Sequence, residues 1–509
     1  MAVTLQDVVT AVSSIGALPT LILAAVTFWS IRAFRQTMSL RHIPTAGGPS
    51  LPILSYIGAL RGLVDDKQIL DEGYAKYKGR AFKIATVSGW TVVVSGPKLV
   101  EELRKANDDE LSLSRAMGQV LQIEYTLGHH PDDAYHTNII RSQLKSNLDA
   151  VFPAMYDELS TAFDEEIPMT PEWRGYTAFE MVKDVVARTS GRIFVGLPMC
   201  RDKDYLALNK QYPVDMVVRS LIIRSFPAEL RPFAGRLFSA FPGHLRRGIK
   251  HLGPEISHRL RLLKEHGAKW EGRPNDMMQW LIDGAPCDEK LTVPQLVTHM
   301  LHVNSTAILT SAVTFTQALL LLAANHQYIK PLREEVEAAL KQHGWTRKAV
   351  LEMHKVDSFF RESQRVASIG NTHIFRVAMK DYTFSDGTFV PEGTFVAMAS
   401  KATHTDETIY SRANDFDPFR FADMREKNID SEDMASKYGM VSLGTNHVPF
   451  GHGKHACPGR FFAATELKAM LAYLVVNYDI KPEKEGVQPP RAFYGSARSM
   501  KVLFRKRRT

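Results

Sequence analysis

The feature that most constrains this chain is a cysteine near its end, at the point where a glycine-rich turn meets an amphipathic segment. Cys457 follows two closely spaced glycines and is followed directly by Pro458. Proline is favoured at the first position of a helix, and apolar residues recur at helical spacing between residues 461 and 474. We therefore expect Cys457 to lie at the start of a helix over about residues 458–478. Unsatisfied N–H groups there would lower the pKa of the thiol and favour a thiolate.

Other interpretations of this cysteine exist. A lone cysteine is most often a small buried hydrophobic residue. His452, His455 and Cys457 are all ligand types for zinc, but no fourth ligand has a suitable spacing. Residues 451–456 also match the G-x-G-x-x-A dinucleotide pattern, which requires a βαβ unit and an acidic residue about 20 positions later. Asp479 alone stands near that position.

The segment around Cys457 resembles the haem-binding loop of the cytochrome P450 family. The resemblance rests on Phe450, Gly451, Gly453, Cys457 and Gly459. In that family the cysteine thiolate is the axial ligand of the haem iron. The resemblance therefore implies haem b as the cofactor, Cys457 as its ligand and Phe450 as a cover for the sulfur side. Many members have an arginine that bonds a haem propionate where this chain has His455, whose imidazole can also donate to a carboxylate.

A charged trio elsewhere in the chain supports the same resemblance. Glu362 and Arg365 are three residues apart on a predicted helix, a pattern that alone indicates a surface ion pair worth roughly 0–1 kcal/mol. Arg420 follows in a Pro-x-Arg-Phe segment. Together they resemble the family's Glu-x-x-Arg pair and the arginine that joins it. The implied role of the trio is a structural clamp and not catalysis.

Three further residues are candidates for contact with the haem propionates. Arg376 begins a strand-like run and matches the position from which family members reach a propionate; an exposed strand arginine is the alternative. Residues 136–141 resemble the helix on which a Trp and an Arg usually make such contacts. Because no Trp is present there, His136 and Arg141 are the candidates.

The long apolar helix expected over residues 291–324 supplies the candidates for residues on the face of the haem that binds O₂. Residues 306–311 align with the family's Ala-Gly-x-Asp/Glu-Thr pattern, which places Thr310 where a hydroxyl helps to relay protons. Leu309 stands where an acid is common, so proton delivery must rely on water, Ser311 or another group. A helical threonine often only donates to the carbonyl one turn earlier, which is the alternative for Thr310.

The first forty residues predict a membrane anchor. Residues 8–31 carry no charge, a run long enough to cross ~30 Å of hydrocarbon as a helix. Arg32, Arg35 and Arg41 follow, which places the remaining chain on the cytoplasmic side. A signal peptide or a buried helix are the alternatives. We expect an anchor at residues 1–40, a Pro/Gly-rich hinge at 41–55 and a haem-thiolate catalytic domain at 56–509.

Composition and periodicity describe the body of the chain. With 45% hydrophobic and 23% charged residues it is an ordinary globular sequence, and its three distant cysteines argue against a disulfide framework. Its net charge of +8 is spread out, which favours an anionic membrane or an acidic protein partner over nucleic acid. Helical periodicity dominates residues 133–347, and short strand-like runs occur near residues 85–94 and after 370. The expected fold is mainly α with small β-sheets, the cytochrome P450 fold with an N-terminal transmembrane helix.

The resemblance also implies a function. The sequence of residues 452–462 most resembles that of filamentous-fungal members of the family. Many of these members oxidise terpenoids or steroids in secondary metabolism. We expect a monooxygenase that acts on a bulky hydrophobic substrate with O₂. We also expect electrons from a separate NADPH-cytochrome P450 reductase, and a single-pass location in the endoplasmic reticulum membrane with the catalytic domain in the cytoplasm.

Several expectations about surfaces and alternative activities complete this prediction. Lys454 and Arg460 are candidates for a basic face toward the acidic reductase. Residues 217–250 are candidates for a roof over the substrate channel that dips into the membrane. A haem-thiolate isomerase or dehydratase that does not use O₂ is an alternative that Leu309 leaves open, and a non-catalytic haem-binding protein is another.

Overall fold

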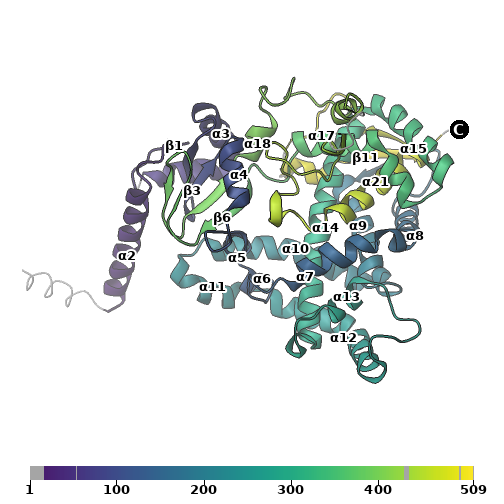
Figure 1. Ribbon diagram of the computed structural model, residues 1–509, viewed down its shortest axis with the longest axis horizontal. Helices are drawn as coiled ribbons and strands as arrows, with labels where there is room; N and C mark the ends of the chain where they lie inside the picture. The colour runs from purple at the N-terminus through teal and green to yellow at the C-terminus, as the bar shows by residue number, and fades with distance from the viewer. Residues whose placement is uncertain (1–16, 53, 429–434, 492–494, 508–509) are drawn as a thin grey trace, which may run out of the picture.

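The computed structural model describes residues 17–52, 54–428, 435–491 and 495–507 (Figure 1). The helices of the first half are α2 (Ala17–Ser39), α3 (Ser55–Lys76), α4 (Pro97–Lys105), α5 (Leu113–Leu121), α6 (Ile123–Thr126), α7 (Tyr135–Ile139), α8 (Leu148–Glu166), α9 (Ala178–Phe194), α10 (Lys203–Arg224), α11 (Arg231–Phe238) and α12 (Phe241–His266). Those of the second half are α13 (Met277–Asp283), α14 (Val293–Ala324), α15 (Ile329–His343), α16 (Arg347–Glu352), α17 (His354–Val366), α18 (Ser400–His404), α19 (Arg420–Glu426) and α21 (Arg460–Asn477). Short turns of other helix types include the π-helix η1 (Ile140–Leu144) and the 3₁₀ turns η3 (Ala228–Leu230) and η6 (Gly453–His455).

The strands form three small sheets. The largest has the order β1 (Thr45–Ala46), β2 (Ala81–Thr86), β3 (Gly89–Val94), β9 (Phe395–Met398), β6 (His373–Ala378) and β4 (Leu111–Ser112). A second joins β10 (Tyr478–Pro482), β11 (Lys501–Lys506) and β5 (Arg174–Thr177), and a third pairs β7 (Tyr382–Thr383) with β8 (Phe389–Val390). The mainly α fold with small sheets that the sequence predicts is therefore confirmed.

The predicted hairpin near residues 85–94 is formed by β2 and β3. The two strands pair antiparallel, with Thr86 opposite Gly89 at the turn. Gly89 has a φ of 120°, a backbone conformation that residues with a Cβ rarely adopt. Strand β3 then pairs parallel with β9, which lies in the last quarter of the chain. One sheet thus joins strands that are far apart in the sequence.

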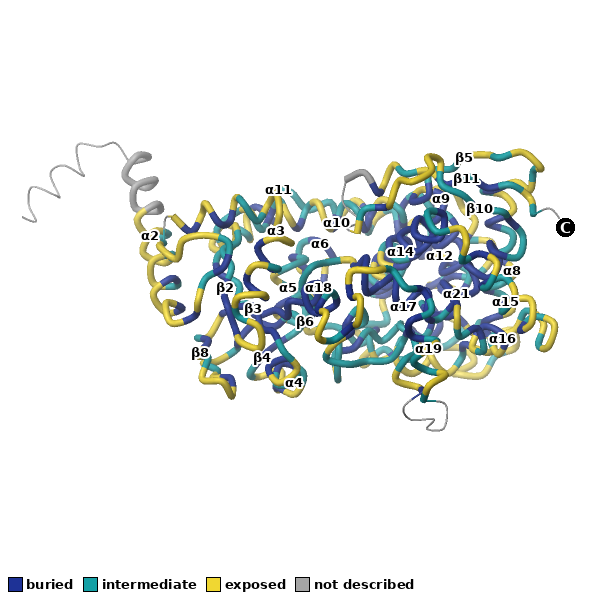
Figure 2. Tube along the Cα trace, turned by 90° about the horizontal axis from the view of Figure 1, so that it is seen from above, coloured by how far each residue is buried: buried dark blue, intermediate teal, exposed yellow. Residues whose placement is uncertain are grey.

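Helix α14 is the core of the helical part. It is 32 residues long, and within the described part of the chain it is the one helix long and apolar enough to cross a membrane. Its most apolar window is 78% buried inside the protein, so it is the predicted central core helix and not a span. Helices α9, α10 and α12 pack against it, and Figure 2 shows α14 and α9 in the region where buried residues are concentrated.

The N-terminal region is described from residue 17 onward. Most of the uncharged run at residues 8–31 lies in α2, but residues 8–16 lie outside the described part. Helix α2 stands at the edge of the molecule (Figure 1). Within the predicted hinge at 41–55, Thr45 and Ala46 pair with β2, and Ile43 is buried. Part of this Pro/Gly-rich stretch is therefore fixed on the large sheet.

The predicted trio Glu362, Arg365 and Arg420 is assembled and buried. Arg365 forms a bidentate pair with Glu362, Nε–Oε2 2.8 Å and Nη2–Oε1 2.6 Å. Arg420 Nε donates to Glu362 Oε1 at 3.2 Å. The side chains of Glu362 and Arg365 are fully inaccessible. The alternative of a surface ion pair is therefore wrong, and the trio is assembled as the resemblance implies.

Replacing Glu362 tests the clamp. Glu362→Gln leaves two buried guanidinium groups without a counter-charge, so we expect the free energy of unfolding to fall by about 3–5 kcal/mol. The matched control is Lys67→Ala, which breaks the exposed i,i+4 pair with Asp71 and should cost at most about 1 kcal/mol. Urea denaturation followed by circular dichroism measures both. Equal effects of the two substitutions would contradict the clamp.

Candidate functional site

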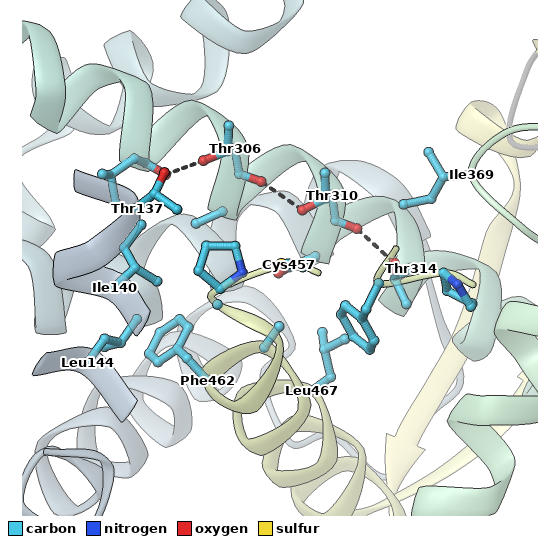
Figure 3. A pocket seen from close by; sticks show the side chains of 18 of the residues that line it. Thr137, Ile140, Leu144, Thr306, Thr310, Thr314, Ile369, Cys457, Phe462 and Leu467 are labelled. Atoms are coloured by element: carbon cyan, nitrogen blue, oxygen red, sulfur yellow. Dashed lines mark hydrogen bonds between the residues drawn. The ribbon is translucent and has the colours of Figure 1, made fainter. Parts of the chain in front are cut away.

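A cavity of about 380 Å³ lies beside Cys457. Its walls come from α14, from α7 and η1, from the start of α21, and from the segment that follows α17. Aliphatic and aromatic side chains line much of it, among them Ile140, Leu144, Phe194, Ile369, Phe462 and Leu467. Figure 3 shows Cys457 between α14 on one side and Phe462 and Leu467 of α21 on the other. Such a volume and lining are typical of a site for an apolar ligand.

A tight turn presents Cys457 to this cavity. Gly451 and Gly453 have φ values of 70° and 69°, which only glycine adopts without strain. The backbone N–H of Cys457 donates to the carbonyl of Phe450 at 2.8 Å and closes the turn. No residue between 441 and 459 forms a strand, so the dinucleotide interpretation lacks its βαβ unit.

The helix after the cysteine begins later than the sequence predicts. Helix α21 starts at Arg460 with Gly459 as its N-cap, so Pro458 is not its first residue. The backbone N–H groups of Gly459 and Arg460 still favour the thiolate form of the sulfur. The N-terminal end of α21 therefore lies close to Cys457, and a short turn separates the two.

The prediction of a lowered pKa for the Cys457 thiol is wrong for the protein without a metal ion at the sulfur. Burial is the largest influence and raises the pKa of the thiol above its usual value. The N–H groups of Gly459 and Arg460 and the positive charge of Arg460 act in the opposite direction but are weaker. Desolvation outweighs them because the sulfur faces a largely apolar cavity. A metal cation at the sulfur would reverse this balance, since a coordinating thiol is deprotonated.

Hydroxyl groups of α14 line the cavity near Cys457. The side chains of Thr306, Thr310 and Thr314 form a row at intervals of four residues (Figure 3). Thr310 Oγ1 donates to the Thr306 carbonyl at 2.7 Å, which is the alternative that the sequence left open. Ser311 also lines the cavity, whereas Leu309 packs against the core. The structure thus places both predicted hydroxyls at the cavity.

Arg376 is the candidate whose environment most favours an anionic ligand. It is 1% exposed, and its Nη1 donates to the carbonyl of Phe375 at 2.8 Å. Its Nε and Nη2 have no hydrogen-bond partner within the described residues. Burial lowers its pKa to about 10, yet the group remains a cation at neutral pH. Two unsatisfied charged donors match a carboxylate, so the alternative of an exposed strand arginine is wrong.

The other candidates for propionate contact lie in two places. Arg141 is exposed and donates from Nη2 to the carbonyl of Lys454 at 3.1 Å, so it touches the cysteine turn. His455 Nε2 lies 2.6 Å from Asp108 Oδ1, and its imidazole is therefore already engaged with a carboxylate. His136 lines the cavity but hydrogen-bonds His299, Nδ1–Nδ1 3.2 Å.

The lining includes polar residues that sequence reasoning did not single out. His302, Gln364 and His373 all contribute to the cavity. His302 lies four residues before Thr306, so helical spacing on the predicted central helix was a signal that could have found it. No comparable spacing relates Gln364 and His373 to Cys457, because separate segments bring them there.

These observations fit a haem. Cys457 offers a soft sulfur ligand for iron, the cavity beside it is largely apolar, and the buried Arg376 offers orphan donors for a carboxylate. Phe450 borders the cavity on the side of the cysteine turn, where the sequence places a cover for the sulfur.

Comparisons with known proteins agree with this chemistry. The family profile described as Cytochrome P450 matches residues 46–500. Cytochrome P450 monooxygenase 151 of Postia placenta is 43% identical, over 93% of this chain and 95% of that protein. Cytochrome P450 monooxygenase CYP512U6 of Ganoderma lucidum is 35% identical over 91% of this chain and 90% of its own length. Cytochrome P450 monooxygenase paxQ of Penicillium paxilli is 29% identical over 94% and 93%.

Arg376 offers a test of the fit to haem. In Arg376→Gln the positive charge is removed, so a propionate loses a charge-assisted hydrogen bond worth about 1.5–3 kcal/mol. We expect the purified variant to lose haem to apomyoglobin about tenfold faster or more. Lys380→Gln, just beyond β6 and exposed, serves as the control and should retain haem normally. Equal rates of haem loss would argue against the assignment.

Proposed function

We propose that this chain, which belongs to the cytochrome P450 family of monooxygenases and carries its haem cofactor, oxidises a bulky terpenoid or steroid. In this proposal Cys457 is the ligand of the haem iron. The observation that carries the proposal is the arrangement of one cavity. Cys457 projects from its turn toward a largely apolar space, and hydroxyl groups of α14 line that same space. The proposed iron ligand, space for an apolar substrate and the proposed proton-carrying hydroxyls thus lie in one cavity.

The bound haem supplies the activation of O₂, a reaction that amino-acid side chains do not perform. The family's reaction inserts one oxygen atom into a C–H bond and reduces the other to water. It consumes two electrons and two protons, and we propose that a separate NADPH-cytochrome P450 reductase supplies the electrons. The polypeptide contributes the sulfur ligand, the apolar surroundings and the path of the protons.

We propose that Thr310 and Ser311 carry protons at the cavity wall. Thr310 is exposed to the cavity, and its Oγ1 donates to its own helix, which leaves the oxygen lone pairs free to accept a proton. A hydroxyl can then release its other proton by rotation. Leu309, next to Thr310, has no ionisable group and packs against the core. We therefore propose that water delivers protons to the hydroxyls.

The lining of the cavity supports a hydrophobic substrate. Ile140, Leu144 and Phe194 form one side, and Ile369 and Phe462 contribute on others. Burying the apolar surface of the haem and of a hydrophobic substrate against these side chains yields roughly 25 cal/mol per Å². The terpenoid or steroid class is our proposal from the resemblance of the cysteine turn to those of filamentous-fungal members.

We further propose a single-pass anchor in the endoplasmic reticulum membrane, with residues 56–509 facing the cytoplasm beyond the anchor (1–40) and hinge (41–55). Phe28, Ile31 and Phe34 of α2 are about half exposed or more. Arg32 forms an ion pair with Glu229 of η3, so α2 lies against the segment between α10 and α11.

That neighbouring segment extends the apolar surface. Leu230 of η3 and Phe233 and Leu237 of α11 are 41%, 69% and 63% exposed. Apolar side chains of this size in one region are typical of a membrane contact. We propose that this surface, within residues 217–250, rests on the lipid beside the anchor.

A reductase-facing surface is proposed near the cysteine turn. Lys454 is exposed and shares Asp108 with His455. Arg460 donates to the carbonyl of Cys457 at 3.0 Å and lies over the Phe461 ring. Positive groups this close to the iron ligand suit an acidic electron donor, because complementary charge steers the encounter.

Replacing Cys457 tests the central assignment. Cys457→His should retain some haem, but the spectrum of its reduced, CO-bound form should move to that of imidazole-ligated haem, with loss of turnover. Cys287→Ala, at the exposed cysteine, is the control and should keep the thiolate spectrum. An unchanged spectrum in Cys457→His would refute the assignment.

Thr310 provides a separate test and distinguishes the isomerase alternative. In Thr310→Val, substrate should bind normally, but the product formed per NADPH should fall about tenfold. This is less than the ~10²–10⁴ of a directly acting acid because water replaces the hydroxyl. The control Thr314→Val, one turn along α14, should keep normal coupling. Product formation without NADPH or O₂ in the wild type would instead select the isomerase or dehydratase.

A further inference from the structure

Four histidine side chains meet where α14 contacts the segment around α7. They are His129, His136, His299 and His302. His302 has ring centroids 4.9 Å from His129 and 4.4 Å from His136, and the rings of His136 and His299 are 5.3 Å apart. His129, His136 and His299 are buried, whereas His302 is partly exposed and lines the cavity. In the described part of the chain, no group of three or more His, Cys, Asp or Glu side chains is arranged to hold a metal ion. The cluster therefore calls for another explanation.

Hydrogen bonds fix the tautomers of one pair in this cluster. His129 Nδ1 lies 2.9 Å from the backbone carbonyl oxygen of His130, which can only accept, so this nitrogen carries the proton. In the neutral ring, His129 Nε2 is then an acceptor. It lies 2.8 Å from His302 Nδ1, which must therefore donate. It follows that His302 Nε2 carries no proton and presents a lone pair.

The surroundings keep the cluster neutral. Burial is the largest influence on all four imidazoles and lowers the pKa of each. Asp133, the acidic group nearest the cluster, is already paired with Lys290, and His299 Nε2 lies 3.7 Å from it. A neutral His302 has one donor and one acceptor, and its donor is occupied by His129.

From this geometry we propose that His302 Nε2 is a specificity-determining acceptor that selects a substrate bearing a hydroxyl group. The inference rests on the proposed function, because it concerns the substrate of the same cavity. No hydrogen bond to Nε2 occurs within the described residues, and the side chain borders the cavity. A donor on the ligand satisfies this nitrogen, whereas a ketone or an ether oxygen places two acceptors face to face.

The position of His302 also sets the size of the substrate. It lies eight residues before Thr310 on α14, which corresponds to about 12 Å along the helix axis. A molecule held by its hydroxyl at His302 and oxidised near Thr310 must span a comparable distance. A fused polycyclic alcohol has this length. The substrate class is therefore an apolar polycyclic skeleton that already carries a hydroxyl group remote from the carbon to be oxidised.

The test is equilibrium binding to the haem-loaded protein, with probes that share one tetracyclic skeleton. The probes are androstane, androstanol, androstanone and the methyl ether of androstanol. Equilibrium dialysis gives each dissociation constant without turnover. We expect androstanol to bind about five- to tenfold more tightly than the other three, the effect of one neutral hydrogen bond. Equal affinities, or a preference for the ketone or the ether, would overturn the inference.

Two variants assign the preference to His302. In His302→Phe the four probes should bind alike. Thr298→Val is the matched control on the same helix; its hydroxyl donates to the Pro294 carbonyl and does not line the cavity, so androstanol should remain preferred. A preference that survives in His302→Phe would overturn the inference. If that variant does not fold, His129→Leu decides, because it frees His302 to change tautomer and should abolish the discrimination between alcohol and ketone.

The outcome is separable from that of the proposed function. A wild-type protein with a thiolate spectrum and oxidation activity but no preference for the alcohol would contradict this inference alone. A protein that fails to oxidise any substrate would contradict the proposed function, whatever the probes show.

Discussion

A single buried carboxylate holds together the segments that lead to the iron ligand. Glu362 of α17 is shared by Arg365 and Arg420 and accepts the backbone N–H of Asp417 at 3.0 Å. Arg365 in turn donates to the carbonyls of His404 and Ala413, both at 2.6 Å. A long irregular segment between α18 and α19 thus depends on charges that lie outside that segment. Irregular backbone inside a protein needs such partners, since it cannot satisfy itself as a helix does.

The same network extends toward the cysteine turn. The ring of His404, whose carbonyl Arg365 binds, accepts the backbone N–H of Val448 at 3.3 Å. Gly451 then donates to the Val448 carbonyl at 2.9 Å, and the turn to Cys457 begins. Hydrogen bonds therefore connect the shared carboxylate, through Arg365 and His404, with the start of the cysteine turn. The family's clamp and its ligand turn are parts of one hydrogen-bonded unit.

The sequence predicted those features that depend on local pattern or on residue type. Helical periodicity located α14, which is apolar on every side, and α17, which is amphipathic. Short β-branched runs on either side of Gly89 located the β2–β3 hairpin. It did not predict the balance of forces at Cys457, because desolvation depends on residues of α14 and η1 that only the fold brings near. For the same reason it missed the pairing of His302 with His129, which are 173 positions apart.

The parallel pairing of β3 with β9 has a consequence for folding during synthesis on the ribosome. Thr91 pairs with Phe395, 304 positions later in the chain. At ~5–20 residues per second of synthesis, the edge of β3 waits about 15–60 s for its neighbour. During that time an anchor at the N-terminus would already hold the nascent chain at a membrane. The hairpin's unpaired edge, rich in valine, is thus a place where a chaperone would need to act before the last fifth of the chain emerges.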